Sequence, residues 1–319
     1  MTTREYRNAE GLLHRDNDLP AQECGSEIKW WWRNGKSHRD NDLPAVINGE
    51  YKAWMVNGKR HRGGGLPAIE YGGRKEWYVN GERHRDGGLP ALECVDGSKQ
   101  WWVNGQRHRD GGFPALECVD GDADGNKEWY VNGQRHRDGG LPAIEYASGS
   151  KEWWVNGQRH RGGGLPGFYD ANGNKEWWVN GYRHRDGGLP AIEYASGSKE
   201  WWVNGQRHRD GGLPAVEWSN GDKEWYVNGK LHRDGGLPAV ELSNGSKYWY
   251  INGKELSTEK GLAHFSFCQK MKEKILLRAQ KKIYFWWIQI CYDLAHHTGC
   301  GQRMAQKNLE VFETMMDPK

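Results

Sequence analysis

The sequence has few of the branched aliphatic side chains that build most protein cores. Hydrophobic residues make up only 36% of its 319 positions, whereas it contains 19 Trp, 14 Tyr and 45 Gly. We therefore do not expect a core packed mainly from Leu, Ile and Val. Aromatic rings must supply most of the buried apolar area instead.

Long apolar segments are also missing. No apolar run reaches the roughly 20 residues that a membrane-spanning helix needs, and the first residues, "MTTREYRNAEG", contain no apolar signal segment. These absences predict a protein that is neither secreted nor inserted in a membrane. The six Cys are accordingly expected to lie in a reducing compartment.

The longer part of the chain carries no excess of either charge. Residues 1–256 hold 35 Lys/Arg against 36 Asp/Glu, whereas residues 257–319 hold 10 against 6. A near-neutral array is not the basic surface that nucleic-acid binding requires, so we do not expect nucleic acid as a partner. The modest positive charge is confined to the C-terminal segment.

What the sequence does contain is one unit repeated along most of its length. The stretch "WWVNGQRHRDGGLPA" at 201–215 has close relatives throughout. The His of this unit recurs at intervals of 23 or 24 residues, with one interval of 28, at His14, His38, His61, His84, His108, His136, His160, His184, His208 and His232. An internal repeat of this length predicts stacked supersecondary units.

Each unit has the pattern of a β-hairpin. Two short segments rich in aromatic and β-branched residues, "KEWWV" and "PAVEY", are separated by an Asn-Gly turn and by a second Gly-containing turn. The predicted fold class is mainly β: an elongated antiparallel meander of about ten 24-residue hairpin repeats and about 20 strands over residues 1–256. An α-helical segment, 257–319, is expected to follow.

Alternation along a strand separates the two aromatics of each unit. Trp201 and Trp202 are expected on opposite faces, so that one aromatic row is core and the other is partly exposed. Strand carboxylates such as Glu200 and Glu217 can neutralise the repeated arginines.

The triplet His-Arg-Asp marks the catalytic loop of protein kinases, but here it occurs eight times and without the other kinase motifs. We interpret it as structural and expect no catalytic residues.

The unit resembles the MORN repeat, a hairpin of about 23 residues. The aromatic strand, the first turn, the His and the closing turn follow the MORN order at Trp77, Asn80-Gly81, His84 and Asp96-Gly97. Arg after the His and the added "LPA" depart from the usual pattern. The array is similar to MORN-variant repeats of large DNA viruses, marseilleviruses in particular, and "RAQKKIYFWWIQICYDL" looks like a C-terminal segment of such proteins.

The resemblance implies scaffolding, protein–protein contact or membrane association rather than catalysis. It makes a virion component, such as a minor capsid or capsid-associated protein, the expected identity, with the virion or host cytoplasm as its location. Capsid proteins, or an internal or host membrane surface, are the implied partners.

One turn carries four extra residues, "VDGDADGNK" at 119–127. Carboxylates at alternate positions before a Gly turn can converge on Ca²⁺. The candidate ligands are Asp120, Asp122, Asp124, Asn126 and Glu128. The alternative is a longer, solvated acidic hairpin without a metal.

From Ser257 onward, apolar residues recur at steps of three or four, which predicts an amphipathic helix capped by Ser257 or Thr258 and a second helix around 304–315. The helix either caps the end of the sheet or docks on a partner or a membrane surface. The candidate docking residues are Lys281, Lys282, Tyr284, Phe285, Trp286, Trp287 and Ile290.

Cys and His residues in the same segment, at Cys291, His296, His297 and Cys300, with His264 and Cys268 upstream, raise a weaker zinc hypothesis.

Two functions of different classes therefore remain open beside the scaffold. One is an adaptor held on a membrane surface by the C-terminal helix. The other is a ligand-binding array whose aromatic rows stack on sugars or hold choline. An enzyme is not expected.

Overall fold

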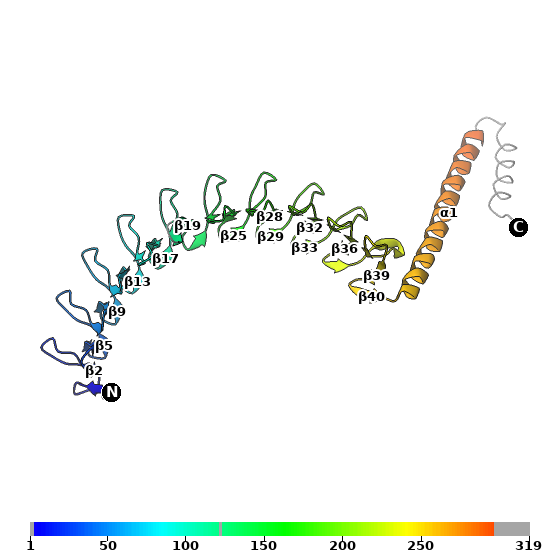
Figure 1. The fold of residues 1–319 in the computed structure, drawn as a ribbon. Coiled ribbons are helices and arrows are strands. Elements are labelled where there is room, and N and C mark those ends of the chain that lie inside the picture. The colour runs from blue at the N-terminus through cyan, green and yellow to red at the C-terminus, as the bar shows by residue number, and fades with distance from the viewer. Residues whose placement is uncertain (1–2, 121–122, 297–319) are drawn as a thin grey trace. The chain divides into compact units, whose positions relative to one another are not determined.

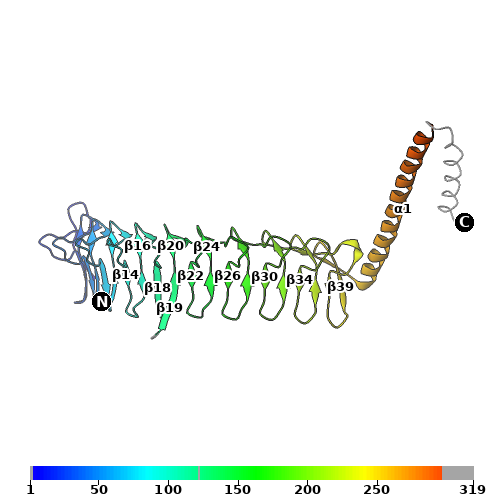
Figure 2. The same ribbon diagram turned by 90° about the horizontal axis from the view of Figure 1, so that it is seen from above.

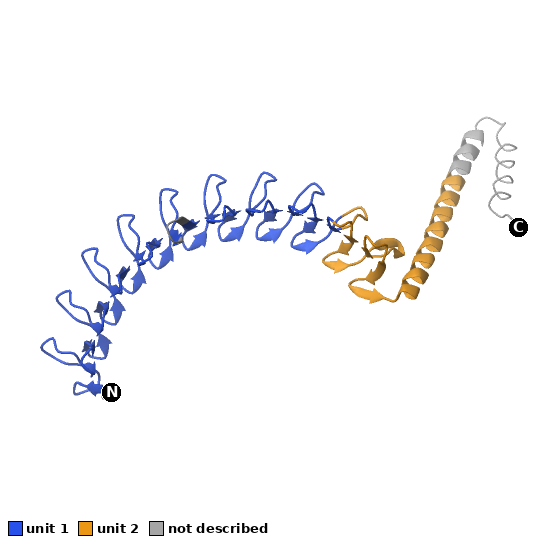
Figure 3. Cartoon of the chain, viewed as in Figure 1, with its two compact units in different colours: residues 1–209, 215–219 blue, residues 210–214, 220–319 orange. Residues whose placement is uncertain are grey.

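The computed structural model describes residues 3–120 and 123–296, with side chains for all of these except 120, 123, 124 and 287–296. The chain divides into unit 1, Met1–Arg209 with Ala215–Ser219, and unit 2, Asp210–Pro214 with Asn220–Lys319. Figure 3 colours the two units. Unit 1 is an elongated row of repeats in which each repeat contacts its sequence neighbours (Figure 1).

The chain is mainly β, as the sequence predicted. Twenty-two strands form an antiparallel sheet in which strands pair with their neighbours along the chain, and Figure 2 shows its hairpins side by side. These strands are β1 Thr3–Glu5, β2 Gln22–Cys24, β3 Ile28–Trp30, β6 Val46–Asn48, β7 Tyr51–Ala53, β10 Ile69–Tyr71, β11 Arg74–Glu76, β14 Leu92–Glu93, β15 Lys99–Gln100, β18 Leu116–Asp120, β19 Ala123–Glu128, β22 Ile144–Glu145, β23 Lys151–Glu152, β26 Phe168–Tyr169, β27 Lys175–Glu176, β30 Ile192–Glu193, β31 Lys199–Glu200, β34 Val216–Glu217, β35 Lys223–Glu224, β38 Val240–Glu241, β39 Lys247–Ile251 and β40 Lys254–Leu256.

The segment predicted as one strand, "KEWWV", is instead divided by its first aromatic residue. The residues after that break pair within their own repeat, so each repeat adds a separate two-stranded hairpin to the main sheet. These short hairpins are β4 Trp32–Arg33 with β5 Lys36–Ser37, β8 Met55–Val56 with β9 Lys59–Arg60, β12 Tyr78–Val79 with β13 Glu82–Arg83, β16 Trp102–Val103 with β17 Gln106–Arg107, β20 Tyr130–Val131 with β21 Gln134–Arg135, β24 Trp154–Val155 with β25 Gln158–Arg159, β28 Trp178–Val179 with β29 Tyr182–Arg183, β32 Trp202–Val203 with β33 Gln206–Arg207, and β36 Tyr226–Val227 with β37 Lys230–Leu231.

Hydrogen bonding at the first Trp explains the break. The backbone N–H of Trp77 donates to the carbonyl of Ala91 at 2.9 Å, and its indole N–H donates to the carbonyl of Gly65 at 2.8 Å. The ring is thus held under the preceding loop while the backbone turns out of the sheet. Asn80 and Gly81 then take φ values of 51° and 91°, which is the tight turn that the Asn-Gly pair predicts.

The core is a row of Trp rings interleaved with Ala. The first Trp of each repeat is buried, and the Ala of each "LPA" is fully buried, as Trp101 and Ala115 illustrate. Space at the Ala position is tight: Gly167 replaces it in one repeat, and a β-carbon there would lie 3.2 Å from Cβ of Trp178. The second aromatic of most repeats, such as Trp102, is only half-buried. The expected division into one core row and one partly exposed row is therefore confirmed.

Unit 2 contains the helix α1, Thr258–His296, and the short 3-10 turn η1, Asp234–Gly236. The Ser257 hydroxyl accepts the backbone N–H of Lys260 at 3.5 Å, which confirms the predicted cap. Within the helical residues that the structure describes, no stretch combines the length and hydropathy that crossing a bilayer requires. The second helix expected around 304–315 lies outside the described residues.

Candidate interaction surface

The repeated triplet lies in a loop that connects each short hairpin to the next strand of the main sheet. We call this loop the arch; in one repeat it spans residues 84–90. Its Arg85 stacks on the ring of Trp77 at 3.8 Å and donates to the carbonyl of Pro90 and to Glu93, both at 3.0 Å. Arg85 thereby links the arch to the buried Trp77 and to the next strand of the main sheet.

The same stack occurs from repeat to repeat, with the guanidinium 3.6–3.8 Å from the ring centroid. The pairs are Arg39/Trp31, Arg62/Trp54, Arg109/Trp101, Arg137/Trp129, Arg161/Trp153, Arg185/Trp177, Arg209/Trp201 and Arg233/Trp225. Arg209 pairs with Glu217 at 2.8 Å and Arg207 with Glu200 at 3.0 Å. The predicted neutralisation of arginines by strand carboxylates is confirmed.

The arch histidine joins neighbouring repeats. Nδ1 of His84 accepts the backbone N–H of Asn104 in the next repeat at 3.1 Å, and its Nε2 lies 2.9 Å from Oδ1 of Asp86. Because Nδ1 is an acceptor, the ring proton of the neutral form is on Nε2 and is donated to Asp86. Both ring nitrogens are thus used for structural contacts, as the structural interpretation of the triplet requires.

The other arginine of each unit, which precedes the His, forms a second ladder. Arg83 lies 4.9 Å and Arg107 lies 5.2 Å from the ring centroid of Trp102. Trp154, Trp178 and Trp202 are likewise each approached by two such guanidinium groups. The half-buried aromatic row is therefore covered by the chain's own cations.

An apolar residue and a carboxylate of each arch remain at the surface. Leu89 is 49% exposed, and the side chain of Asp86 is 94% exposed, whereas that of Arg85 is only 18% exposed. Since the cation is turned inward and the anion outward, the outer surface of the arch is acidic and apolar. We call the exposed Leu or Phe and Asp side chains of successive arches the arch face.

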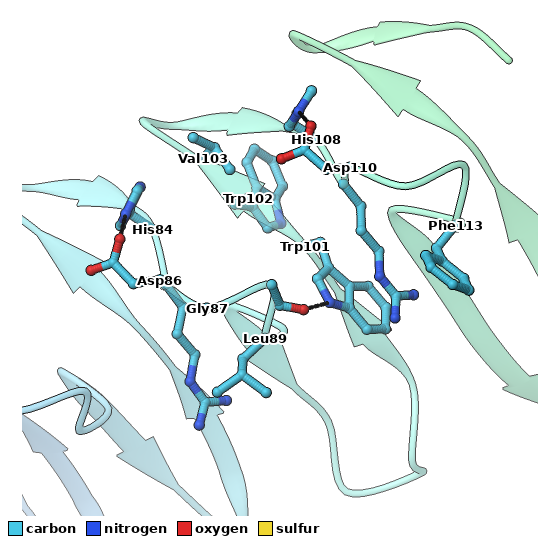
Figure 4. A pocket seen from close by; sticks show the side chains of 13 residues that line it. His84, Asp86, Gly87, Leu89, Trp101, Trp102, Val103, His108, Asp110 and Phe113 are labelled. Carbon is cyan, nitrogen blue, oxygen red and sulfur yellow. Dashed lines mark hydrogen bonds and ion pairs between the residues drawn. The ribbon is translucent and has the colours of Figure 1, made fainter. Parts of the chain in front are cut away.

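The arch face recurs along unit 1 and contains shallow pockets between consecutive arches. One pocket is lined by Leu89, Trp102, Val103 and Phe113 together with the neighbouring His and Asp side chains (Figure 4). Equivalent pockets occur between four other pairs of arches. The exposed apolar residues of the row are Leu19, Leu43, Leu66, Leu89, Phe113, Leu141, Leu165 and Leu189.

In unit 2 the last arch is covered. A β-carbon on Gly236 would lie 2.5 Å from Cα of Phe265 in α1, and one on Gly261 of α1 would lie 2.4 Å from the ring of Trp249. Gly236 is therefore buried, and Leu237 is half-buried. The start of α1 caps the last repeat by covering the surface that each arch of unit 1 leaves open.

Farther along α1 most of the described side chains are exposed. Every residue from 271 to 280 is exposed, as are Ile283, Phe285 and Trp286 farther along. Of the predicted docking residues, Lys282 is also exposed, while Lys281 and Tyr284 are partly buried. The side chains of Trp287 and Ile290 lie outside the described set.

The predicted calcium ligands fall mostly outside the described side chains. Asp122 is not described, nor are the side chains of Asp120 and Asp124; the backbone pairs Val119 with Asp124 in an extended hairpin of β18 and β19. The Asn126 side chain accepts the backbone N–H of Ala147 at 3.0 Å.

The remaining candidate ligand, Glu128, accepts from Tyr130 at 2.6 Å and Arg135 at 3.1 Å. No cluster of three or more His, Cys, Asp or Glu suited to a metal occurs among the side chains that are described. Of the zinc candidates, His264 contacts Cys268 at 3.7 Å, whereas His297 and Cys300 are not described.

The arch face itself was not predicted from the sequence. Its signal was present as the Leu that precedes Pro in each "LPA", an apolar residue placed in a loop. Without the fold, that Leu could not be distinguished from a core residue, because the adjacent Ala is fully buried.

A scan against protein-family models and a search of curated proteins find no match for this chain.

Proposed function

We propose that this chain is a non-enzymatic structural scaffold that binds other proteins through the arch face. The observation that carries the proposal is that some side chains of each arch contact the core or the next repeat, whereas others are exposed to solvent. The Arg and His of the repeated triplet are used to hold the fold together, while Leu89 and Asp86, with their equivalents, present the same acidic and apolar chemistry at most repeats. Gly63 and Gly162 replace the Asp in two repeats. A surface repeated many times suits multivalent binding, because linked sites raise overall affinity without any new contact.

We further propose that the chain is a MORN-type component of a virion and that its partners include capsid proteins. The similarity of the repeat and of the C-terminal segment to those of large DNA viruses supports this part. Cross-linking mass spectrometry of purified virus particles tests it. Absence of the chain from particles would exclude the virion assignment and leave the scaffold proposal standing.

Site-specific photo-cross-linking tests the scaffold proposal directly. A photoreactive phenylalanine analogue replaces Leu89, Phe113 or Leu141 of the full chain in the host cell. All three side chains are exposed on the arch face, so the same partner proteins are expected to be captured from each. Mass spectrometry of the adducts identifies them.

Val95 provides the matched control. It is 74% exposed and apolar, but it lies in the turn between β14 and β15 rather than in an arch. Capture of the same proteins from position 95, or of none from the three arch positions, would contradict binding through the arch face.

A membrane surface is a second candidate partner, favoured by one observation. Ile283, Phe285 and Trp286 are exposed on α1 next to Lys282, and an apolar face beside cations is typical of helices that bind anionic lipid surfaces. Flotation with anionic liposomes separates this candidate from the first. Equal flotation of the full chain and of a chain ending at Leu256 would exclude α1 as an anchor.

The arrangement of the aromatic rows argues against a sugar- or choline-binding array. Stacking of such ligands needs an open ring face. Trp101 is buried beneath Arg109, and Trp102 is approached by Arg83 and Arg107. A stacked ligand would have to compete with the chain's own guanidinium groups for these rings.

A further inference from the structure

The capped arch of unit 2 shows how an arch accommodates a helix. Its two glycines pack directly against α1: Gly236 lies against the backbone of Phe265, and a β-carbon on Gly235 would lie 3.1 Å from Nζ of Lys272. Three arches of unit 1 have the same Asp-Gly-Gly-Leu sequence, at 86–89, 138–141 and 186–189, and three more keep the Gly-Gly pair before Leu or Phe. Their glycines are exposed and present no side chain, so the same close approach of a helix backbone is open to them.

The mostly exposed segment 271–286 of α1 has the chemistry that the arch face lacks. Residues 271–286 contain five Lys/Arg and one Glu, a net charge of +4. The arch face presents a nearly fully exposed carboxylate at positions such as Asp86, Asp110 and Asp138. A cationic helix on an acidic surface has complementary charge, which favours encounter and fixes orientation.

The spacing of the exposed apolar residues on α1 also matches the spacing of neighbouring arches. Leu276 and Ile283 are exposed and lie two helical turns apart, which is about 10.5 Å along an α-helix. Neighbouring arches are separated by two strands of the main sheet, about 9.6 Å. A helix lying along the row can therefore place one apolar side chain at each of two consecutive arches.

We propose that the arch face of unit 1 binds the segment 271–286 of α1 from a second copy of this chain. The inference rests on the proposed function of the arch face as a protein-binding surface and names its occupant. Leu276 and Ile283 pack against exposed leucines of adjacent arches, and Lys281 and Lys282 pair with the outward Asp side chains. Because each copy has several open arches and a single segment 271–286, the contact joins copies into larger assemblies.

Sedimentation velocity of the purified full chain over a concentration series tests the proposal. Self-association is expected, and Leu89→Asp with Phe113→Asp and Leu141→Asp in one chain is expected to weaken it at least tenfold. Leu276→Asp with Ile283→Asp in α1 should have the same effect. Val95→Asp, which adds one negative charge to an exposed apolar position away from the arches, should leave self-association unchanged.

A charge exchange makes the test specific for the pairing. One chain carries Asp86→Lys, Asp110→Lys and Asp138→Lys, and another carries Lys281→Glu and Lys282→Glu. Each alone is expected to associate more weakly than the parent chain, and a mixture of the two should recover association. All these side chains lie outside the contact between α1 and the last arch, and circular dichroism verifies that each variant stays folded.

Three results would overturn the proposal: a chain that stays monomeric at all concentrations, association that the arch variants do not change, or a mixture that recovers nothing. Binding of α1 to liposomes with no self-association would assign 271–286 to a membrane instead. If the chain is monomeric but arch positions still capture other proteins in cells, the scaffold function stands and only this occupant is wrong. Self-association through the arches with no other protein captured in cells would support this occupant and contradict the binding of other proteins there.

Discussion

The guanidinium of Arg109 lies 3.6 Å from the centroid of the Trp101 ring, and the same side chain donates to Glu117 at 2.9 Å. One residue thus joins the arch, the core ring and the next strand of the main sheet. Lysine cannot reproduce this arrangement, because its ammonium lacks the planar face that stacks and the fork that bonds two acceptors.

Arg109→Lys is therefore expected to destabilise its repeat by about 1–2 kcal/mol. Hydrogen exchange of the amides in 101–117 measures the local loss, which a global melting curve of a repeat array would average. Lys59→Arg, at an exposed hairpin tip, is the control and should change exchange by little. If the amides of 101–117 exchanged at the same rate in Arg109→Lys as in the parent chain, the stack of Arg109 on Trp101 would not contribute to stability.

Two repeats lack the carboxylate that the others supply eight residues after the arch Arg: Ile47 follows Arg39, which pairs with Asp18 instead, and Tyr169 follows Arg161. Arg161 stacks on Trp153 and donates to the carbonyl of Pro166, but Tyr169 stands at the position that Glu117 occupies eight residues after Arg109. Burial without a paired anion lowers the pKa of Arg161.

Tyr169→Glu should consequently stabilise this repeat by about 0.5–1 kcal/mol at neutral pH, by completing the pair. Hydrogen exchange over 153–169 measures the gain. In Tyr169→Gln the side chain has the same length as Glu but no charge, and only a small part of the gain in stability is expected. Equal effects of Glu and Gln would mean that the loss of Tyr, not the ion pair, is responsible.

Alkaline pH should weaken the array through two partly buried tyrosines, Tyr146 and Tyr194. Burial raises the pKa of Tyr146 to about 12, assisted by the carboxylate of Glu152, to which its hydroxyl donates at 2.9 Å. An unfolded tyrosine ionises near pH 10, so between pH 10 and 12 the folded chain retains a proton that the unfolded chain has lost. The contribution of this hydroxyl to the free energy of unfolding is thus fully present below pH 10 and is lost as pH rises toward 12.

Absorbance titration of tyrosinate measures the ionisation, and urea denaturation at pH 9 and pH 11 measures its consequence. Tyr146→Phe should lose less stability between these two pH values than the parent chain. Burial and Glu200 raise the pKa of Tyr194 to about 12 in the same way, so Tyr146→Phe with Tyr194→Phe should flatten the profile further. An identical slope in all three chains would exclude these hydroxyls as its source.

The period of the sequence was sufficient to predict the sheet, because Asn-Gly turns and short β-branched segments recur in every unit. It was not sufficient to predict the break at the first Trp. Strand alternation treats Trp201 and Trp202 as consecutive residues of one strand, whereas the bond from the Trp201 indole to the carbonyl of Gly188 is a contact with a residue 13 positions earlier. Local periodicity contains no information about such a contact.

The arch face was missed for a related reason. Composition indicated that aromatic rings form the core, and the Arg and His of the arch triplet make the structural contacts that the sequence suggested. Which of its charges face inward depends on the ring beneath them, however. Arg85 and Asp86 are adjacent in sequence, yet only the stack on Trp77 shows that the cation is buried and the anion exposed.

The packing of α1 against the last repeat depends on one glycine, Gly261. A β-carbon on Gly261 would lie 2.4 Å from Cγ and 2.8 Å from Cβ of Trp249, and such distances cannot be relieved by rotating a flexible chain end. Gly261→Val should therefore displace the start of α1 from Trp249 and uncover the last arch. Since Trp249 also donates to the carbonyl of Gly236 at 3.1 Å, the terminal repeat loses its cover and its amides should exchange faster.

Hydrogen exchange across 234–256 measures this effect, with an acceleration of at least tenfold expected there and none in unit 1. Ala263→Val is the matched control: it makes the same β-branched change two residues along the helix at an exposed position, where only a small loss of helix propensity is expected. Equal acceleration by both variants would show that helix propensity, not the contact with Trp249, holds α1 on the last repeat.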